Sequence, residues 1–276
     1  MTNLLNRYAQ LSAEYARSYA ERSMDRILDA LHASANRNEA EEKIHDLYIR
    51  NGQQFLDAYK NLFVTHLQNQ FEAKPADRDP LCIVFSGGFG AGKTTLQKAL
   101  DAGTAPFNLN DIEAINLYLA ANPFLFDFKW AWSASGLYDS NDHQGTFPFA
   151  RAAGSGAKDA AMELAVEYGL DLLYPSSLTP HVSDGSATLK NEIERLQGYQ
   201  AKGYKLVIIG CAAKVGACLE RVSLRDRKPT DAEVVKSVEG FNQHYALFSS
   251  IANFSILLDT GFQQSDYSVL SPEVLS

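Results

Sequence analysis

The spacing of apolar residues divides the chain into a helical first part and a mixed second part. In residues 2–32 apolar side chains recur mostly at gaps of three or four, which predicts an amphipathic helix. Residues 55–71 show the same spacing. The stretch 74–80 holds two prolines and four charged residues, a composition typical of a linker. We therefore expect a small all-helical N-terminal domain over residues 1–75.

After residue 80, short apolar runs alternate with helical patterns. The expected strands are 81–85, 106–110, 170–174, 204–210 and 254–258, and the expected helices are 92–100, 112–121, 154–169, 186–202, 214–225 and 231–251. Thr230 and Glu233 have the spacing of a capping box at the start of the last helix. Strands that alternate with helices predict an α/β domain over residues 76–276, with a parallel sheet flanked by helices.

Two segments of this second part show no regular helical or strand pattern. Residues 124–149 are rich in aromatic side chains. The alternation in residues 124–132 is compatible with a strand, and an excursion that lines a substrate pocket is the alternative. The tail after Gly261 is polar, so we expect it to be loosely held.

The strand at 81–85 is followed by Gly-Gly-Phe-Gly-Ala-Gly-Lys-Thr, from Gly87 to Thr94. This stretch fits the P-loop pattern G-x-x-x-x-G-K-[ST], and it lies between a strand and a helix, as that motif requires. Glycines at these positions let backbone N–H groups turn toward phosphate oxygens, and the positive end of the helix favours an anion there. The sequence therefore predicts nucleotide binding. A glycine-rich turn with an accidental Lys-Thr is the alternative, and the flanking strand and helix argue against it.

Each residue of the loop has an expected role. Lys93 is expected to reach the β- and γ-phosphates of ATP, and Thr94 to place its hydroxyl on Mg²⁺. The residues expected to bind the nucleotide are Gly87, Gly88, Phe89, Gly90, Ala91, Gly92, Lys93, Thr94 and Thr95.

The composition of the chain indicates which classes of binding partner to expect. The chain has 276 residues, and 33 acidic residues against 25 basic ones give a net charge of −8. Sequence-independent nucleic-acid binding needs a basic footprint, so we expect no nucleic-acid partner. No apolar run is long enough to span a bilayer, and the first residues do not resemble a signal peptide. We therefore expect a soluble cytoplasmic protein with no membrane partner.

The cysteines and histidines show no spacing typical of a metal site. Cys82, Cys211 and Cys218 lie in apolar or small-residue stretches, which predicts buried free thiols. Mg²⁺ carried by the nucleotide is accordingly the metal ion that we expect.

Charged residues near the expected strand ends are candidates for catalysis. Asp111 follows a strand and precedes a helix, so it is either a general base for the attacking hydroxyl or a helix N-cap. Asp159 is either a substrate contact or a solvated helix charge. Arg221, Arg225 and Arg227 cluster at a helix end, where they either contact phosphate or complement the helix dipole.

On these residues the chain resembles the zeta-toxin family, P-loop kinases that phosphorylate UDP-N-acetylglucosamine. The resemblance covers roughly residues 80–260. The matching features are the P-loop with Lys93-Thr94, Asn110-Asp111 at a strand end, Asn122-Pro123, a helix that carries Asp159, residues 200–204 before a strand, Glu220-Arg221 before a basic lid, and the helix 231–251.

The resemblance implies ATP and Mg²⁺ as cofactors and a sugar nucleotide as the small-molecule substrate. It implies that Asp111 is the base for the sugar hydroxyl, and that Asp159 binds substrate where the family has a Glu. Arg221 and Arg227 match the family's lid arginines. Pro175 stands where the family usually has a Glu after a strand, so a kinase for another acceptor, such as an antibiotic or a nucleoside, stays open.

The N-terminal segment has two interpretations. Residues 1–75 resemble the inhibitory antitoxin domain of single-chain relatives, which implies an intramolecular contact with the kinase domain. A stabilising appendage is the alternative. A third hypothesis, from another class, is a nucleotide-dependent switch or scaffold in which hydrolysis only drives conformational change.

Overall fold

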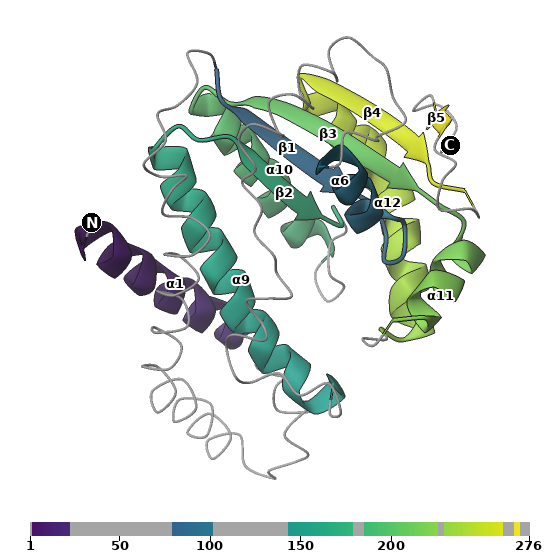
Figure 1. The fold of residues 1–276 in the computed structure, drawn as a ribbon, viewed down its shortest axis with the longest axis horizontal. Helices are drawn as coiled ribbons and strands as arrows, with labels where there is room; N and C mark the ends of the chain where they lie inside the picture. The colour runs from purple at the N-terminus through teal and green to yellow at the C-terminus, as the bar shows by residue number, and fades with distance from the viewer. Residues whose placement is uncertain are drawn as a thin grey trace. The chain divides into compact units, whose positions relative to one another are not determined.

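The computed structural model describes residues 2–22, 79–101, 143–178, 185–225, 229–261 and 268–270 (Figure 1). The helices are α1 (Thr2–Arg22), α6 (Lys93–Asp101), α9 (His143–Glu167), α10 (Gly185–Ala201), α11 (Val215–Ser223) and α12 (Asp231–Ile251). The strands are β1 (Leu81–Ser86), β2 (Leu172–Ser176), β3 (Lys205–Ala212), β4 (Phe254–Asp259) and β5 (Ser268–Leu270). The predicted strand 106–110 and helix 112–121 lie outside the described residues.

The chain divides into two compact units. Unit 1 comprises Met1–Lys74 and Leu125–Tyr168, and unit 2 comprises Pro75–Phe124 and Gly169–Ser276. Helix α9 therefore belongs to the same unit as α1, whereas its residues lie within the range 76–276 predicted for the kinase domain.

Unit 2 contains a five-stranded sheet in the order β2-β1-β3-β4-β5. The first four strands are parallel, and β5 pairs antiparallel with β4. Figure 1 shows α6 on one face of this sheet and α10 and α12 on the other. The mixed α/β fold with a parallel sheet flanked by helices confirms the predicted fold class. The predicted capping box is also confirmed, because Thr230 accepts from the backbone of Glu233 and Glu233 accepts from the backbone of Thr230.

The core of unit 2 is formed by the central strands and the helices on them. Residues 82–86 of β1 are buried, as are residues 206–212 of β3. Such continuous burial is typical of parallel strands covered on both faces. All three cysteines are free and buried, as predicted. No helix in the described ranges combines the length and the apolar character that crossing a membrane requires.

Three predicted elements differ from the structure. Helix α9 begins at His143, although residues 143–149 were expected to be irregular; Pro148 lies in its second turn, where it removes one backbone hydrogen bond. Strand β2 is shifted two residues toward the C-terminus, so Pro175 lies within it and pairs with Phe85. The tail was expected to be loose, but residues 268–270 form a strand because they supply ladder partners to β4.

Candidate nucleotide site

The P-loop connects β1 to α6 and packs against three different elements of unit 2. Gly87 lies against the end of β3, where an added methyl group would come within 2.6 Å of the Cys211 carbonyl oxygen. A methyl group on Gly88 would meet Val238 of α12 at 2.6 Å, and one on Gly90 would meet the carbonyl oxygen of Cys218 in α11 at 2.6 Å. The loop therefore has no room for side chains at these glycines.

Hydrogen bonds fix the loop in the same position. The backbone N–H of Phe89 donates to the hydroxyl of Ser237, a buried residue of α12, at 3.0 Å. Ala91 closes a turn onto the carbonyl oxygen of Gly88 at 3.2 Å. Gly90 and Gly92 have φ angles of 80° and 96°, a region that side chains disfavour. Packing or backbone conformation therefore favours glycine at the two motif positions, Gly87 and Gly92, and also at Gly88 and Gly90, where the motif allows any residue.

Lys93 is the first residue of α6, and its ammonium group lies inside the loop. Its Nζ donates to the carbonyl oxygen of Gly87 at 2.5 Å and to that of Gly88 at 3.0 Å. Burial lowers the pKa of Lys93 to about 8, and the positive charge of Arg225 also lowers it. A phosphate anion in the loop would reverse this effect, because an opposite charge favours the protonated form.

The loop residues fit the phosphates and the metal ion that the motif implies. The first N–H groups of α6 have no acceptors within the helix, so they are available to an anion at its positive end. Thr94 is exposed in the first turn of α6, where its hydroxyl is accessible to a nucleotide-bound Mg²⁺. A methyl group on Gly92 would make ordinary van der Waals contact with Thr260, at 3.6 Å. Among the described residues, no group of three or more His, Cys, Asp or Glu side chains could hold a metal ion.

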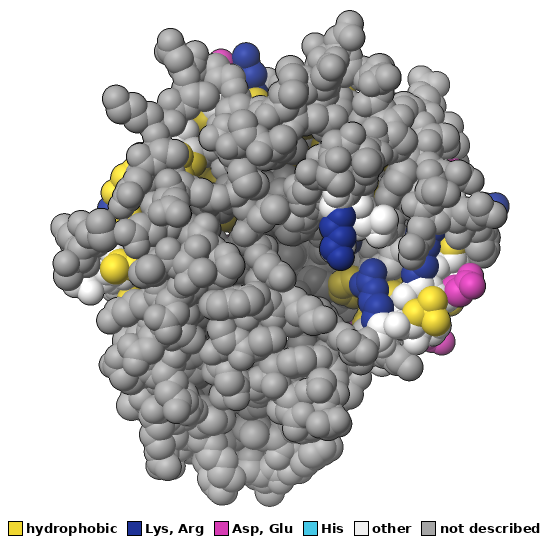
Figure 2. All heavy atoms as spheres, in the orientation of Figure 1, with side chains coloured by type: hydrophobic (Ala, Val, Ile, Leu, Met, Phe, Trp, Pro, Cys, Tyr) yellow, Lys and Arg dark blue, Asp and Glu magenta, His cyan; other side chains and the backbone are white. Residues whose placement is uncertain are grey.

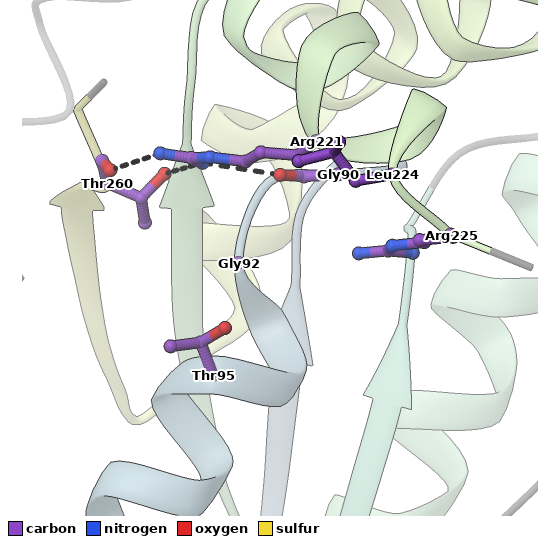
Figure 3. Close-up of a pocket in the computed structure, with 7 residues that line it drawn as sticks. All are labelled: Gly90, Gly92, Thr95, Arg221, Leu224, Arg225 and Thr260. Atoms are coloured by element: carbon purple, nitrogen blue, oxygen red, sulfur yellow. Dashed lines mark hydrogen bonds between the residues drawn. The ribbon is translucent and has the colours of Figure 1, made fainter. Parts of the chain in front are cut away.

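A cavity of about 290 Å³ lies beside the loop (Figure 3). Its lining residues come from the P-loop, α6, the end of α11 and the end of β4: Gly90, Gly92, Thr95, Arg221, Leu224, Arg225 and Thr260. On the face drawn in Figure 2, Lys and Arg side chains gather over the region of α11. A cavity that adjoins a phosphate loop and carries two guanidinium groups suits a polyanionic ligand.

The structure brings together some of the predicted site residues. The loop residues from Gly87 to Thr95 and Arg221 surround one region of unit 2. Asp159 lies on α9 in unit 1, where its Oδ2 accepts from the hydroxyl of Tyr19 at 2.6 Å. Asp111 and Arg227 lie outside the described residues.

Several residues of the site were not identified from the sequence. Thr260 lines the cavity directly after β4, and ligands of parallel sheets bind at the carboxyl ends of strands, so this rule could have identified it. Leu224 lines the cavity with 83% of its surface exposed. Ser237 belongs to no sequence motif. It contacts the loop only because α12 packs there, and it lies 148 positions from Phe89 in the sequence.

Comparison with known proteins identifies structural neighbours. No family model matches the sequence, and no curated protein matches it significantly. One solved structure is from the PezAT chromosomal toxin-antitoxin system of Streptococcus pneumoniae, with 17% identity, a TM-score of 0.47, and coverage of 78% of this chain and 81% of the other. Another is AvrRxo1-ORF1 in complex with AvrRxo1-ORF2, with sulphate ions, at 14% identity and a TM-score of 0.51, covering 80% of this chain and 71% of the other.

The second of these structures, with its TM-score of 0.51, shares the overall fold of this chain. At 14% identity, that likeness extends to the fold alone. The reaction and its acceptor have to be argued from the residues of this chain.

Proposed function

We propose that this chain is an ATP-dependent kinase that transfers the γ-phosphoryl group to a hydroxyl of UDP-N-acetylglucosamine. The observation that carries the proposal is the P-loop, in which Lys93 lies within a fixed ring of backbone groups beside a cavity with two arginines. Phosphoryl transfer depends on positioning and on positive charge around the γ-phosphate, and this region supplies both. The choice of acceptor is supported by the sequence resemblance.

The roles proposed for the loop residues are supported by the position of Lys93 in the loop, and the role proposed for Asp111 by the sequence resemblance. The loop and Lys93 hold the phosphates, and Thr94 supplies a hydroxyl ligand for Mg²⁺, which neutralises charge on the phosphate oxygens when bound. Asp111 is proposed as the base that takes the proton of the acceptor hydroxyl. The acceptor oxygen forms a bond to the γ-phosphorus as the bond from that phosphorus to the bridging oxygen breaks, and ADP leaves. A cytoplasmic location follows from the use of ATP.

The sequence and register of strand β2 favour a second candidate for the acceptor. Its register places Pro175 beside Phe85 and Ser176 beside Ser86, at the end of β1 from which the P-loop begins. The family's Glu is absent from this strand. An acceptor with a hydroxyl that is not part of a sugar nucleotide is therefore the second candidate.

The experiment incubates the purified full chain and Mg²⁺ with ATP labelled on its γ-phosphate. One reaction contains UDP-N-acetylglucosamine and another contains a bacterial metabolite extract. Labelled UDP-N-acetylglucosamine would support the proposal, and a different labelled product would identify the second acceptor. Nucleotide hydrolysis with no labelled small molecule would favour a switch or scaffold and contradict the kinase.

Two variants serve as matched controls in this experiment. Lys93→Ala should bind ATP weakly and transfer nothing. Asp111→Asn preserves shape and removes the base, so it should retain ATP affinity and lose transfer by about 10²–10⁴-fold. If Asp111→Asn loses affinity and rate together, Asp111 is a structural residue.

We further propose that residues 1–75 restrain the kinase. The support is the resemblance to antitoxin domains. Helix α1 forms polar contacts with α9, including the bond from Tyr19 to Asp159, which the resemblance implies as a substrate-binding residue. A residue that is engaged by α1 is less available to a substrate, so loosening α1 should raise activity.

A further inference from the structure

Arg221 and Arg225 line the same cavity, but their guanidinium groups have different surroundings. Arg221 Nη1 donates to the carbonyl oxygen of Gly90 at 3.3 Å and to the Thr260 hydroxyl at 3.5 Å. Its Nη2 donates to the carbonyl oxygen of Thr260 at 2.8 Å and to that of Gly261. Arg221 therefore joins three parts of the site: the P-loop, α11 and the chain that leaves β4.

Arg225 lies four residues further along the chain, just beyond the end of α11, and is exposed. Figure 3 shows the guanidinium of Arg221 bonded to both Thr260 and Gly90, whereas the guanidinium of Arg225 lies apart from these bonds. Within the described part of the chain, the guanidinium of Arg225 has no hydrogen-bond or ion-pair partner. It nevertheless lies near enough to Lys93 for its charge to lower the pKa of that ammonium group, after the larger effect of burial. Two cations thus converge on the P-loop, and a polyanion would relieve their repulsion.

We propose that Arg225 contacts the transferred γ-phosphoryl group, and that Arg221 is a positioning residue that holds the P-loop and the end of β4 in place. This inference rests on the proposed function and assigns separate tasks to the two arginines. A guanidinium group has five N–H donors and no acceptor. Because Arg221 already donates to Gly90, Thr260 and Gly261, turning it toward phosphate would leave backbone carbonyls without their donor. Arg225 has no such hydrogen bonds to lose among the residues that the structure describes.

The test compares affinities for ATP and ADP, which differ by the γ-phosphate. Both dissociation constants are measured with Mg²⁺ on the full chain, for the native sequence and for Arg225→Ala, Arg225→Lys, Arg221→Ala and Arg221→Lys. Lys236→Ala removes a cation from an exposed position of α12 and serves as the matched control. Neither measurement requires an acceptor, so the test does not depend on the identity of the substrate.

Arg225→Ala should weaken ATP binding by about 10–100-fold and leave ADP binding within about threefold, because one charge-assisted contact to the γ-phosphate is lost. Arg225→Lys should recover part of the loss, since it keeps the charge. Arg221→Ala should weaken ATP and ADP by similar factors and lower the melting temperature. Arg221→Lys keeps the positive charge but loses the paired N–H donors of the guanidinium group, so it should also weaken ATP and ADP binding by similar factors. This variant provides the test if Arg221→Ala does not fold. Lys236→Ala should change neither affinity.

Two results would overturn the assignment. One is an equal loss of ATP and ADP affinity in Arg225→Ala. The other is a loss confined to ATP in either Arg221 variant, with an unchanged melting temperature. If the native chain binds both nucleotides and the variants give either result, the arginine assignment fails and the kinase proposal stands. If the native chain binds neither nucleotide, the proposed function itself fails.

Discussion

In each of the two units, glycine allows two segments of backbone to pack closely together, and the close packing has a different role in each unit. In unit 1, Gly156 of α9 faces α1 so closely that a methyl group would lie 2.7 Å from the Ser12 carbonyl oxygen and 2.5 Å from the Ala16 nitrogen. In unit 2, Gly88 and Gly90 allow the P-loop to touch α12 and α11. The first approach joins two helices, and the second fixes a ring of N–H groups. A methyl group in unit 1 should therefore act by separating α1 from α9, whereas one in the loop should act directly on the nucleotide site.

The polar contacts of the two regions differ in the same way. Across the α1–α9 contact, side chains bind side chains: Tyr15 donates to Glu163, Tyr19 donates to Asp159, and Arg7 pairs with Glu167. Around the P-loop, side chains bind the backbone, as the bonds from Lys93 and Arg221 show. Side-chain pairs specify which helices meet, whereas bonds to the backbone specify the shape of a loop. The predictions below test this division.

The largest effect should come from Lys93→Ala. The ammonium group compensates phosphate charge, so ATP turnover should fall by at least about 10²–10³-fold. Burial of the ammonium group is unfavourable, as its lowered pKa indicates, so its removal should not unfold the chain. Circular dichroism and a turnover assay on the same sample measure both properties. Unchanged turnover would show that the P-loop is not the catalytic nucleotide site.

The next effect should come from Gly90→Ala. The residue has a φ of 80°, and the new methyl group would lie 2.6 Å from a carbonyl oxygen of α11. Overpacking and strain should cost about 1–3 kcal/mol of unfolding free energy and also weaken nucleotide binding. Gly216→Ala is the matched control, because a methyl group there meets nothing within 4 Å and Ala favours the helix. Equal behaviour of the two variants in denaturant unfolding would contradict the close approach.

Gly156→Ala tests unit 1 in the same manner. The methyl group should force α1 away from α9 at a cost of about 1–3 kcal/mol, measured by denaturant unfolding. Gly198→Ala, in α10 with open space around it, is the control. If residues 1–75 restrain the kinase, turnover per folded molecule should rise in Gly156→Ala. Loss of stability with unchanged turnover would favour a stabilising appendage.

The pH dependence of ATP binding should report the environment of Lys93. With its pKa lowered by burial to about 8, the group is protonated below that pH and neutral above it in the free protein. Because the phosphates favour the protonated form, ATP affinity should be full below about pH 8 and fall by up to about tenfold per unit above it. Folding stability responds in the opposite sense: the buried cation is unfavourable below pH 8, and this penalty declines as the pH rises further. Calorimetric titrations at several pH values would show the bend, which Lys93→Ala should lack.

The smallest effect should come from Tyr19→Phe. This change removes the hydroxyl that donates to Asp159 and retains the ring. Loss of one such bond should cost about 0.5–1.5 kcal/mol, measured by chemical denaturation. Nucleotide affinity should stay unchanged, because Tyr19 belongs to unit 1. A Tyr19→Phe protein that loses ATP affinity would show that the two regions are not separate.

The contrast between the regions also explains what the sequence could reveal. The P-loop was predictable because its requirements are local: a buried strand, glycines at fixed positions and a helix after them. The capping box of Thr230 and Glu233 was predictable for the same reason. The α1–α9 pairing was not, since Tyr19 and Asp159 are 140 positions apart and neither residue lies in a motif.

The role of Arg221 shows a similar limit at the site itself. Its residue type and its place on a helix predict a phosphate contact, which stays a prediction. Its bonds to the carbonyl oxygens of Gly90, Thr260 and Gly261 could not be predicted. Backbone acceptors have no signature in a sequence, because every residue carries one. The order of the strands in the sheet was not predictable either, because the spacing of apolar residues predicts where strands occur and not which strands pair.

That strand order bears on how the chain acquires its structure during synthesis. Strand β1 lies between β2 and β3, and Ser86 of β1 bonds to Ile209, 123 positions later in the chain. At about 5–20 residues per second, β1 would leave the ribosome on the order of 10 s before its partner exists. Its apolar residues and unpaired edges would be accessible throughout that interval. Parallel sheets with such distant partners fold slowly, so we expect the nascent chain to need chaperone protection until β3 has emerged.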